Sequence, residues 1–568
     1  MRNWENVRQV YLEKYMEEKM KNVMKTPTYE EVFGIPSISL DDLLKKIPTK
    51  PLIVTLAVIN AQVEKGTSDT EILDGLFRFM TINHRFNFYS HYLPIQFKNF
   101  PNNQLFHPMY TCHLMTRALE NFNEDHYEMD SSHHWYFIHS YLMAVSETLS
   151  VQDEILIKAN NDALSLQCQW PFSLVQLQYN TPGSISLDMM KMLVFVDTIA
   201  QNKKYNEYGQ KFMNFIGQPI LNYTSMLFDL ANMKNQFTYQ GKTLPNFSFN
   251  LAKKHQPLLD HLALDIKNAS LIEDFNINFK ALKVYPLLFH YGTYIILYRE
   301  FLKSQIYNGF IFLFYAHSGI KKIFPCFGNF KSEIGKTMTE ERIYAALLKT
   351  IFHNDVSSLK ITNVDSDPDA YIRIGNTIFL FEVKDNMMAS KVIIAKDYEI
   401  IKKEIDRRFI EEYKKDGKKK HKGIGQLIEH IKFLNTKSFK FDSIDTQRSQ
   451  IEVYPIVLYS DNQFCLKGLN TYLGDIFEGK LSGHSFKYVH RPVILSLQYL
   501  YEFVNCFNSE TFCDLLDYYL RYTQDCKIHN NIDEMNTAPE YIFKLPDKRM
   551  DPVVAHQRFV NYLNISIK

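Results

Sequence analysis

Asp369, Glu382 and Lys384 are residues whose types and spacing could carry chemistry. They belong to the segment DPDAYIRIGNTIFLFEVKD, residues 367–385. Gly375-Asn376 separates two runs of β-branched and aromatic residues, a pattern that predicts a β-hairpin with a two-residue loop. Pairing outward from this loop places Asp369 opposite Glu382, and the alternation of side chains along a strand puts Lys384 on the same face. The spacing therefore predicts a cluster of two carboxylates and one ammonium group.

This cluster requires compensation, because opposed carboxylates repel each other across a sheet and a buried charge is costly unless it is paired. The neighbouring residues are apolar on both faces of the second strand, so we expect that strand to be buried. A divalent cation between Asp369 and Glu382 would remove the repulsion, and oxygen ligands suit Mg²⁺ or Mn²⁺. Lys384 would then orient or help to deprotonate a metal-bound water, or stabilise charge developing on a phosphate. Asp367 is the alternative to Asp369 if the strand register differs.

The elements around the hairpin must position this cluster. Apolar periodicity and β-branched runs predict a mixed α/β domain at residues 326–465. The expected order is a helix at 336–352, strands at 359–364 and 370–384, a charged helical insert at about 395–422, a helix at 423–435 and a strand over IEVYPIVLY, residues 451–459.

Pro368-Asp369, the hairpin and Glu382-Val383-Lys384 together resemble the PD-(D/E)xK nuclease superfamily, which has the restriction-endonuclease-like fold. The pattern of that family is helix, strand, strand with Pro-Asp, strand with Glu-x-Lys, helix and strand. The predicted order matches this pattern apart from the charged insert. The resemblance covers residues 330–460 only, and it implies an Mg²⁺-dependent endonuclease that hydrolyses phosphodiester bonds, with Mn²⁺ as a substitute. DNA is the expected substrate because it is the commoner substrate in that family.

The resemblance also implies roles for particular residues. Asp369 and Glu382 would bind the metal, and Lys384 would act beside them in catalysis. The first helix of the family often supplies a further carboxylate, for which Glu340 and Glu341 are both candidates. Glu341 is slightly preferred as a catalytic residue and metal ligand, because it precedes Tyr344, Leu347 and Leu348 at helical spacing. Many members place a glutamine on the helix after Glu-x-Lys, which makes Gln426 a further candidate.

A basic stretch directly precedes the Gln426 helix. Residues 402–425 hold ten Lys or Arg against five Asp or Glu. Beside a metal site, a basic loop would grip a phosphate backbone without reading its sequence. The candidate nucleic-acid-binding residues are Lys418, Lys419, Lys420 and Lys422. The alternative is a solvated surface loop between two helices.

The remainder of the chain shows no recognisable catalytic motif. Residues 1–325 carry helical periodicity and are expected to form a regulatory or recognition region, and residues 466–568 are expected to form a helical C-terminal region. Neither G-x-x-x-x-G-K-[ST] nor G-x-G-x-x-G occurs in the helical N-terminal part, which argues against a nucleotide-binding loop there. His133, His134 and His139 are expected to be ordinary helix or cap residues.

Composition narrows the class of protein. Apolar residues make up 46% of the chain and charged residues 22%, which indicates a globular protein. Lys and Arg number 64 against 63 Asp and Glu, so a polyanion would have to be held by local basic patches. Seven scattered cysteines without C-x-x-C fit a reducing compartment and give no zinc framework. The N-terminus lacks an apolar signal core and no apolar run is long enough to span a bilayer, so we expect a cytoplasmic protein without membrane contact.

These patterns leave two functional hypotheses. The first is a DNA-cleaving nuclease, which by analogy with nucleases fused to long sensing regions would be a bacterial defence effector. A homodimer and a trigger or partner protein bound by the N-terminal region are possible additions to it, and RNA is the alternative substrate. The second is a catalytically silent protein that uses the nuclease fold to bind nucleic acid or to assemble with partners.

Overall fold

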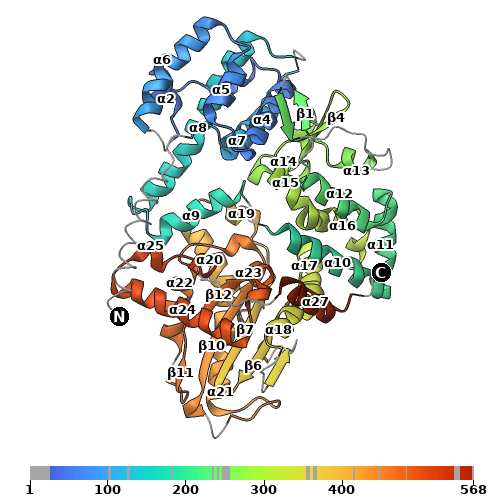
Figure 1. Cartoon of the computed structure of the whole chain (residues 1–568), viewed down its shortest axis with the longest axis vertical. Coiled ribbons are helices and arrows are strands. Elements are labelled where there is room, and N and C mark those ends of the chain that lie inside the picture. The colour runs from blue at the N-terminus through green and yellow to red at the C-terminus, as the bar shows by residue number, and fades with distance from the viewer. Residues whose placement is uncertain are drawn as a thin grey trace. The chain divides into compact units, whose positions relative to one another are not determined.

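The computed structural model describes most of the chain. The described residues are 26–99, 104–124, 128–180, 183–232, 236–239, 242–245, 256–353, 358–361, 367–413, 416–444, 448–481, 483–542 and 551–565. The chain separates into two compact units (Figure 1), one formed by Met1–Glu154 with Leu230–Leu302 and the other by Ile155–Asp229 with Lys303–Lys568. This division differs from the three consecutive regions expected from the sequence. None of the helices in the described residues is long and apolar enough to cross a membrane.

The first unit is mostly helical, as its periodicity predicts, and it carries two small antiparallel hairpins. His133, His134 and His139 all lie on its helix α8, which agrees with the expectation of ordinary helix residues. Its elements are α2 (Tyr29–Phe33), α3 (Leu40–Leu44), α4 (Thr49–Glu64), α5 (Asp69–Phe77), α6 (Ile82–Asn99), α7 (Pro108–Glu120), most of α8 (Ser131–Lys158), β1 (Gln236–Tyr239), β2 (Lys242–Pro245), α13 (Gln256–His261), α14 (Lys280–Val284), β3 (Leu287–His290), β4 (Thr293–Ile296) and the start of α15 (Arg299–Ser304).

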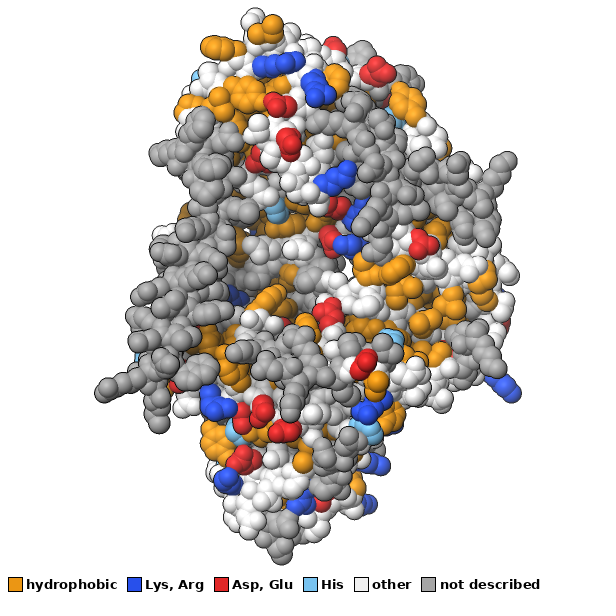
Figure 2. Space-filling model, viewed as in Figure 1, with side chains coloured by type: hydrophobic (Ala, Val, Ile, Leu, Met, Phe, Trp, Pro, Cys, Tyr) orange, Lys and Arg blue, Asp and Glu red, His pale blue; other side chains and the backbone are white. Residues whose placement is uncertain are grey.

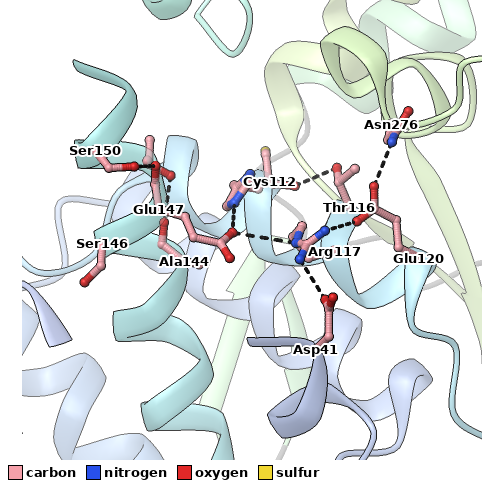
Figure 3. A network of polar contacts seen from close by, with 12 residues as sticks. Asp41, Cys112, Thr116, Arg117, Glu120, Ala144, Ser146, Glu147, Ser150 and Asn276 are labelled. Carbon is pink, nitrogen blue, oxygen red and sulfur yellow. Dashed lines mark hydrogen bonds and ion pairs between the residues drawn. The ribbon is translucent and has the colours of Figure 1, made fainter. Parts of the chain in front are cut away.

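Arg117 on α7 joins several helices of this first unit (Figure 3). Its guanidinium donates to Asp41 at 2.7 Å and to Glu120 at 2.5 Å, and its Nε lies 3.6 Å from Glu147 of α8. His113 Nε2 lies 2.8 Å from the same Glu147 carboxylate. One guanidinium thus contacts carboxylates from α3, α7 and α8. We interpret this network as a structural link between the three helices.

The second unit is built on a mixed sheet. Its strands are β5 (Ser358–Ile361), β6 (Ala370–Ile374), β7 (Thr377–Lys384), β10 (Glu452–Tyr459), β11 (Tyr488–Val489) and β12 (Val493–Ser496). β5, β6 and β7 pair antiparallel in that order, and β10 lies parallel to β7. β11 and β12 then pair parallel with the far side of β10. The structure is therefore a helical unit joined to a mixed α/β unit.

Both faces of β7 are buried, because the strand runs through the centre of this unit. Ile378 and Leu380 contribute to a core with the helices α9 (Leu166–Leu177), α20 (Tyr398–Phe409), α21 (Ile424–Thr436) and α22 (Leu469–Lys480). On the other face, Phe379 and Phe381 contact Phe512 of α24 (Ser509–Ile528). The expected two-sided burial of the strand is confirmed.

This unit contains further helices, several of which are labelled in Figure 1. They are α10 (Ile185–Gln201), α11 (Lys203–Ile216), α12 (Ile220–Asn232), α16 (Phe310–His317), α17 (Phe327–Ile334), α18 (Ala345–Ile351), α19 (Ser390–Ile393), α23 (Leu497–Glu502), α25 (Ile532–Met535), α26 (Pro539–Ile542) and α27 (Pro552–Leu563). A ten-residue π-helix, η6 (Gly335–Tyr344), leads directly into α18.

Two expectations for this unit were wrong in detail. The charged insert is a helix, α20, followed by an antiparallel hairpin of β8 (Glu411–Tyr413) and β9 (Lys419–His421), and is not helical throughout. The C-terminal region is not purely helical, since Val493–Ser496 forms β12 and extends the sheet beside β10. Because this strand completes the same sheet, the C-terminal residues belong to the second unit.

Candidate active site

The hairpin has the register that its loop predicts. Ile374 pairs with Thr377, and Ala370 pairs with Phe381. Asp369 directly precedes β6 and is therefore the next position outward, level with Glu382. Its Oδ2 accepts a hydrogen bond from the backbone N–H of Val383 at 2.7 Å, which ties the aspartate to the strand that carries Glu382.

Glu382 and Lys384 are in direct contact on one face of β7. Lys384 Nζ donates to Glu382 Oε2 at 3.0 Å. The Glu382 residue is 0% exposed and Lys384 is 7% exposed. Alternation along the strand thus delivers the carboxylate and the ammonium group to one buried point.

Helix α21 supplies two further groups. Lys384 Nζ also donates to Gln426 Oε1 at 3.0 Å, and Gln426 Oε1 accepts a second hydrogen bond from Gly423 N at 3.1 Å. His430 Nε2 lies 3.1 Å from Glu382 Oε1. Gln426 and His430 are four residues apart and therefore share one helix face, which lies over the polar end of β7. His430 did not figure among the sequence candidates, although its spacing from Gln426 could have indicated it.

The electrostatic environment shifts the pKa values of Asp369 and Glu382 in opposite directions. Burial, followed by the charge of Glu382, raises the pKa of Asp369 to about 8. Burial also opposes ionisation of Glu382, but Lys384 and His430 outweigh it and hold the Glu382 pKa below its usual value. Burial would lower the pKa of Lys384, yet Glu382 and Asp369 raise it. At neutral pH the cluster is therefore a charged Glu382–Lys384 pair beside an Asp369 that mostly keeps its proton.

The cluster borders a cleft of about 880 Å³ within the second unit, and Glu382 itself is not among the lining residues. Asp369, Lys384, Gln426 and His430 line it, together with lysines from three elements. The lining residues are Ser332, Gly335, Lys336, Glu340, Asp369, Val383, Lys384, Asp385, Asn386, Lys419, Lys420, His421, Lys422, Gln426, Glu429, His430, Lys432 and Phe433.

The structure reverses the preference between the two glutamates of the first helix. Glu340 lines the cleft, and burial, with smaller contributions from nearby charges, raises its pKa. Glu341 is exposed and does not line the cleft. The reason is the π-helix η6, because its i to i+5 hydrogen bonds advance the chain by more residues per turn than an α-helix. The face that continues through Tyr344 therefore includes Glu340 instead of Glu341.

This difference predicts unequal effects for two neighbouring substitutions. If the chain is the Mg²⁺-dependent nuclease that the sequence resemblance implies, Glu340→Gln is expected to lower the affinity for Mg²⁺ and the rate of DNA cutting by about 10- to 100-fold, because it removes a carboxylate near Asp369 and Glu382. Glu341→Gln serves as the matched control and is expected to leave both within about twofold. Isothermal titration with Mg²⁺ and a cutting assay measure the two quantities. An equal loss in both variants, or a larger loss in Glu341→Gln, would contradict the assignment of Glu340.

Three of the four candidate lysines line the cleft. Lys419 and Lys420 lie on β9 and Lys422 follows it, whereas Lys418 lies outside the cleft with its Nζ 3.7 Å from Asp416. Lys419 pairs with Glu411 at 2.5 Å and Lys422 pairs with Glu412 at 3.4 Å. On the face drawn in Figure 2, the visible acidic and basic side chains are interspersed, so a polyanion would depend on a local site such as this cleft.

Asp385 is a buried residue of the site that the sequence did not single out. One carboxylate oxygen accepts from Lys331 at 2.8 Å and from Thr339 at 2.9 Å, and the other accepts from Ser460. Gly335 lets the two segments approach, because a Cβ there would lie 2.9 Å from Asp385 Oδ2. Asp385 thus fastens the π-helix that carries Glu340 to the end of the strand that carries Lys384.

The donor set partly fits a hard divalent cation. Asp369, Glu382 and Glu340 offer carboxylate oxygens, the ligands that Mg²⁺ prefers. The Tyr344 hydroxyl is buried without a hydrogen-bond partner among the described residues, and after burial the charges of Asp369, Glu382 and Glu340 raise the Tyr344 pKa. A buried hydroxyl without a partner is the kind of group that a bound ion or water would satisfy. However, the described part of the chain holds no preassembled group of three metal-ligating side chains, and both Glu382 oxygens already contact Lys384 and His430. A cation that binds Glu382 would therefore have to share its carboxylate with Lys384 and His430.

Comparison with known proteins identifies no relative. No family model, no curated protein and no solved structure is significantly similar to the chain.

Proposed function

We propose that this protein is a metal-dependent nuclease that hydrolyses DNA phosphodiester bonds. The observation that carries this proposal is the meeting of Asp369, Glu382 and Lys384 beside a lysine-lined cleft, which Asp369 and Lys384 themselves line. Burial of opposed carboxylates without a catalytic or binding purpose would be a net cost to stability. Perturbed pKa values in a cleft are typical of functional sites.

The topology adds support. Apart from the inserted α19, α20 and β8–β9 hairpin, a helix, three antiparallel strands, a helix and a strand parallel to the third occur in the order expected for the PD-(D/E)xK resemblance. The Asp lies at the start of the second strand and the Glu-x-Lys at the end of the third. The proposal rests on this agreement between topology and site residues.

Each residue has a proposed role. Asp369, Glu382 and Glu340 would hold Mg²⁺, with Mn²⁺ as a substitute. When bound, the ion would polarise the scissile phosphate and lower the pKa of a bound water. Lys384 would bring its ammonium group to the phosphate and stabilise the charge that develops there.

Two residues of α21 would support these groups. Gln426 holds Lys384 by accepting its hydrogen bond, and His430 holds Glu382. Neither would need to touch the substrate, because each orients a group that does.

The helical unit would have a separate task in this proposal. By analogy with nucleases fused to long sensing regions, it would bind a trigger or partner protein in a bacterial defence effector. A homodimer would allow cleavage of both strands of a duplex.

One observation favours the alternative of a catalytically silent binding protein. Glu382 is engaged by both Lys384 and His430, so a buried ion pair could replace the metal as the partner of that carboxylate. Such a protein would bind nucleic acid equally well in EDTA and would cut neither DNA nor RNA.

A cutting assay separates these functions. Purified protein would be incubated with supercoiled plasmid, single-stranded DNA and single-stranded RNA in Mg²⁺, in Mn²⁺ and in EDTA. We expect metal-dependent cutting of DNA that falls about 10³-fold in Glu382→Gln. Glu399→Gln, an exposed glutamate on α20, is the matched control and should cut normally. Absence of cutting by the wild type, together with no Mg²⁺ binding that depends on Asp369 and Glu382, would overturn the proposal.

A further inference from the structure

The walls of the cleft carry cations from separate elements. Lys336 belongs to the π-helix η6, Lys420 to β9 and Lys432 to α21, and all three line the cleft above the buried Lys384. The lining of the cleft therefore draws lysines from three separate elements.

Two of these lysines form no ion pair with another described residue. Lys419, Lys422 and Lys432 form ion pairs with Glu411, Glu412 and Glu429, respectively. Lys336 and Lys420 are exposed, and neither has an ion pair with another described residue. They are therefore the lysines of the cleft best placed to exchange solvent for the phosphates of a ligand.

An aromatic side chain lies at the same cleft. Phe433 lines it and stays 38% exposed. Phe439 stacks against the ring with 5.0 Å between centroids, and Lys437 Nζ lies 5.9 Å from the ring centre. These contacts hold the ring in place while part of it faces the cleft.

The dimensions limit what can reach the catalytic groups. The volume of about 880 Å³ lies in the range of small-molecule sites. Lys384, which lines the cleft, and Glu382, which it contacts, are almost fully buried. A stiff duplex carries its phosphates on the outside of a wide rod, but a single strand can bend into a recess.

We infer that the cleft takes single-stranded DNA, with its phosphates held by Lys336 and Lys420 and a base against Phe433. A positively charged groove combined with an aromatic platform is the usual way in which proteins bind single strands without reading their sequence. The inference rests on the proposed function, because it names the substrate class of the same site.

Binding in EDTA tests the inference without cutting. Fluorescence anisotropy would compare a labelled 12-nucleotide dT strand with its dA·dT duplex and with the matching rU strand. We expect the dT strand to bind at least tenfold more tightly than the duplex. Lys336→Ala and Lys420→Ala should each weaken binding and reduce the slope of log K against log salt by about 0.7, which corresponds to one phosphate contact on a single strand.

Matched variants sharpen the result. Phe433→Ala should weaken binding of the dT strand about tenfold, the lower range for loss of one stacked base. Lys349→Ala removes an exposed lysine of α18 that does not line the cleft, and it should change neither affinity nor salt slope. Equal or tighter binding of the duplex, or equal effects of Lys349→Ala and Lys336→Ala, would overturn the inference. Tighter binding of the rU strand would overturn the choice of DNA.

The outcome is separable from that of the proposed function. Tight, lysine-dependent binding of the dT strand without any cutting in Mg²⁺ would support the single-strand site and refute the nuclease. Cutting of duplex DNA that is lost in Glu382→Gln, with weak binding of the single strand, would do the opposite.

Discussion

Lys384→Met is expected to lower the rate of DNA cutting by about 10³-fold, the usual effect of removing one electrostatic stabiliser from a desolvated site. The lysine Nζ lies 3.0 Å from Glu382 Oε2 and 3.0 Å from Gln426 Oε1, so it is held at one point beside the carboxylates. Methionine keeps an unbranched chain of similar length but lacks the charge and the donors. The rate of strand cleavage at saturating DNA measures the effect, because a group that acts in the transition state lowers kcat more than it raises KM.

Two control variants test whether a loss of activity is specific to the Lys384 ammonium group. Lys391→Met changes an exposed lysine on α19 and should leave the rate unaltered. Lys384→Arg keeps the positive charge but changes its shape, and it should restore only a small part of the activity. Lys384→Met removes one of the two side chains that contact the buried Glu382 carboxylate and leaves only His430. Thermal melting must therefore show a cooperative transition, to establish that the variant is folded. If folded Lys384→Met retains more than a tenth of the wild-type rate, Lys384 is not a catalytic residue.

The hairpin could be predicted from the sequence because its register depends on local geometry. A two-residue loop at Gly375-Asn376 fixes every pair outward from it, and Gly375 indeed has a positive φ of 57°. Asp369, Glu382 and Lys384 were therefore brought together correctly. Asp367, the fallback for a different register, does not line the cleft.

The choice between Glu340 and Glu341 failed for a physical reason. The spacing argument assumes an α-helical phase through residues 336–352, whereas Gly335–Tyr344 is a π-helix. A π-helical phase depends on tertiary contacts, here including the approach of Asp385 to Gly335, and the local residue pattern does not mark it. Asp385 itself was missed because a lone acid after a strand has no signature before its three partners come together.

The extent of the second unit also depends on long-range packing. Val493–Ser496 and the start of α23 form one mostly apolar run, which does not distinguish a buried strand from a helix. Likewise, Trp170 and Leu174 on α9 join the core beneath β7 although they lie about two hundred residues earlier in the chain. The charged hairpin β8–β9 has no apolar alternation, so its strands give no signal of their own.

Asp369→Asn is expected to stabilise the metal-free protein by an amount that grows as the pH rises from 5 to 8. Burial and the charge of Glu382 raise the pKa of Asp369 from 3.8 to about 8. A raised folded-state pKa contributes stability that is fully present below the unfolded value and is lost as pH rises through the folded value. The wild type therefore loses stability across this window, whereas asparagine does not titrate. For one proton the difference grows by at most about 1.4 kcal/mol per pH unit.

Urea unfolding in EDTA at each pH measures the difference, because other titrating groups are common to both proteins. Asp367→Asn is the matched control for loss of one carboxylate two positions away in the sequence. Added Mg²⁺ should reverse the order at pH 8, since a ligand that binds only the folded wild type stabilises it in proportion to its saturation. Binding of the ion would also displace the proton of Asp369, so the gain should increase with pH. A constant difference between pH 5 and 8 would show that Asp369 does not hold a proton in the folded protein. Stabilisation of Asp369→Asn by Mg²⁺ to the same extent as the wild type would remove Asp369 from the metal site.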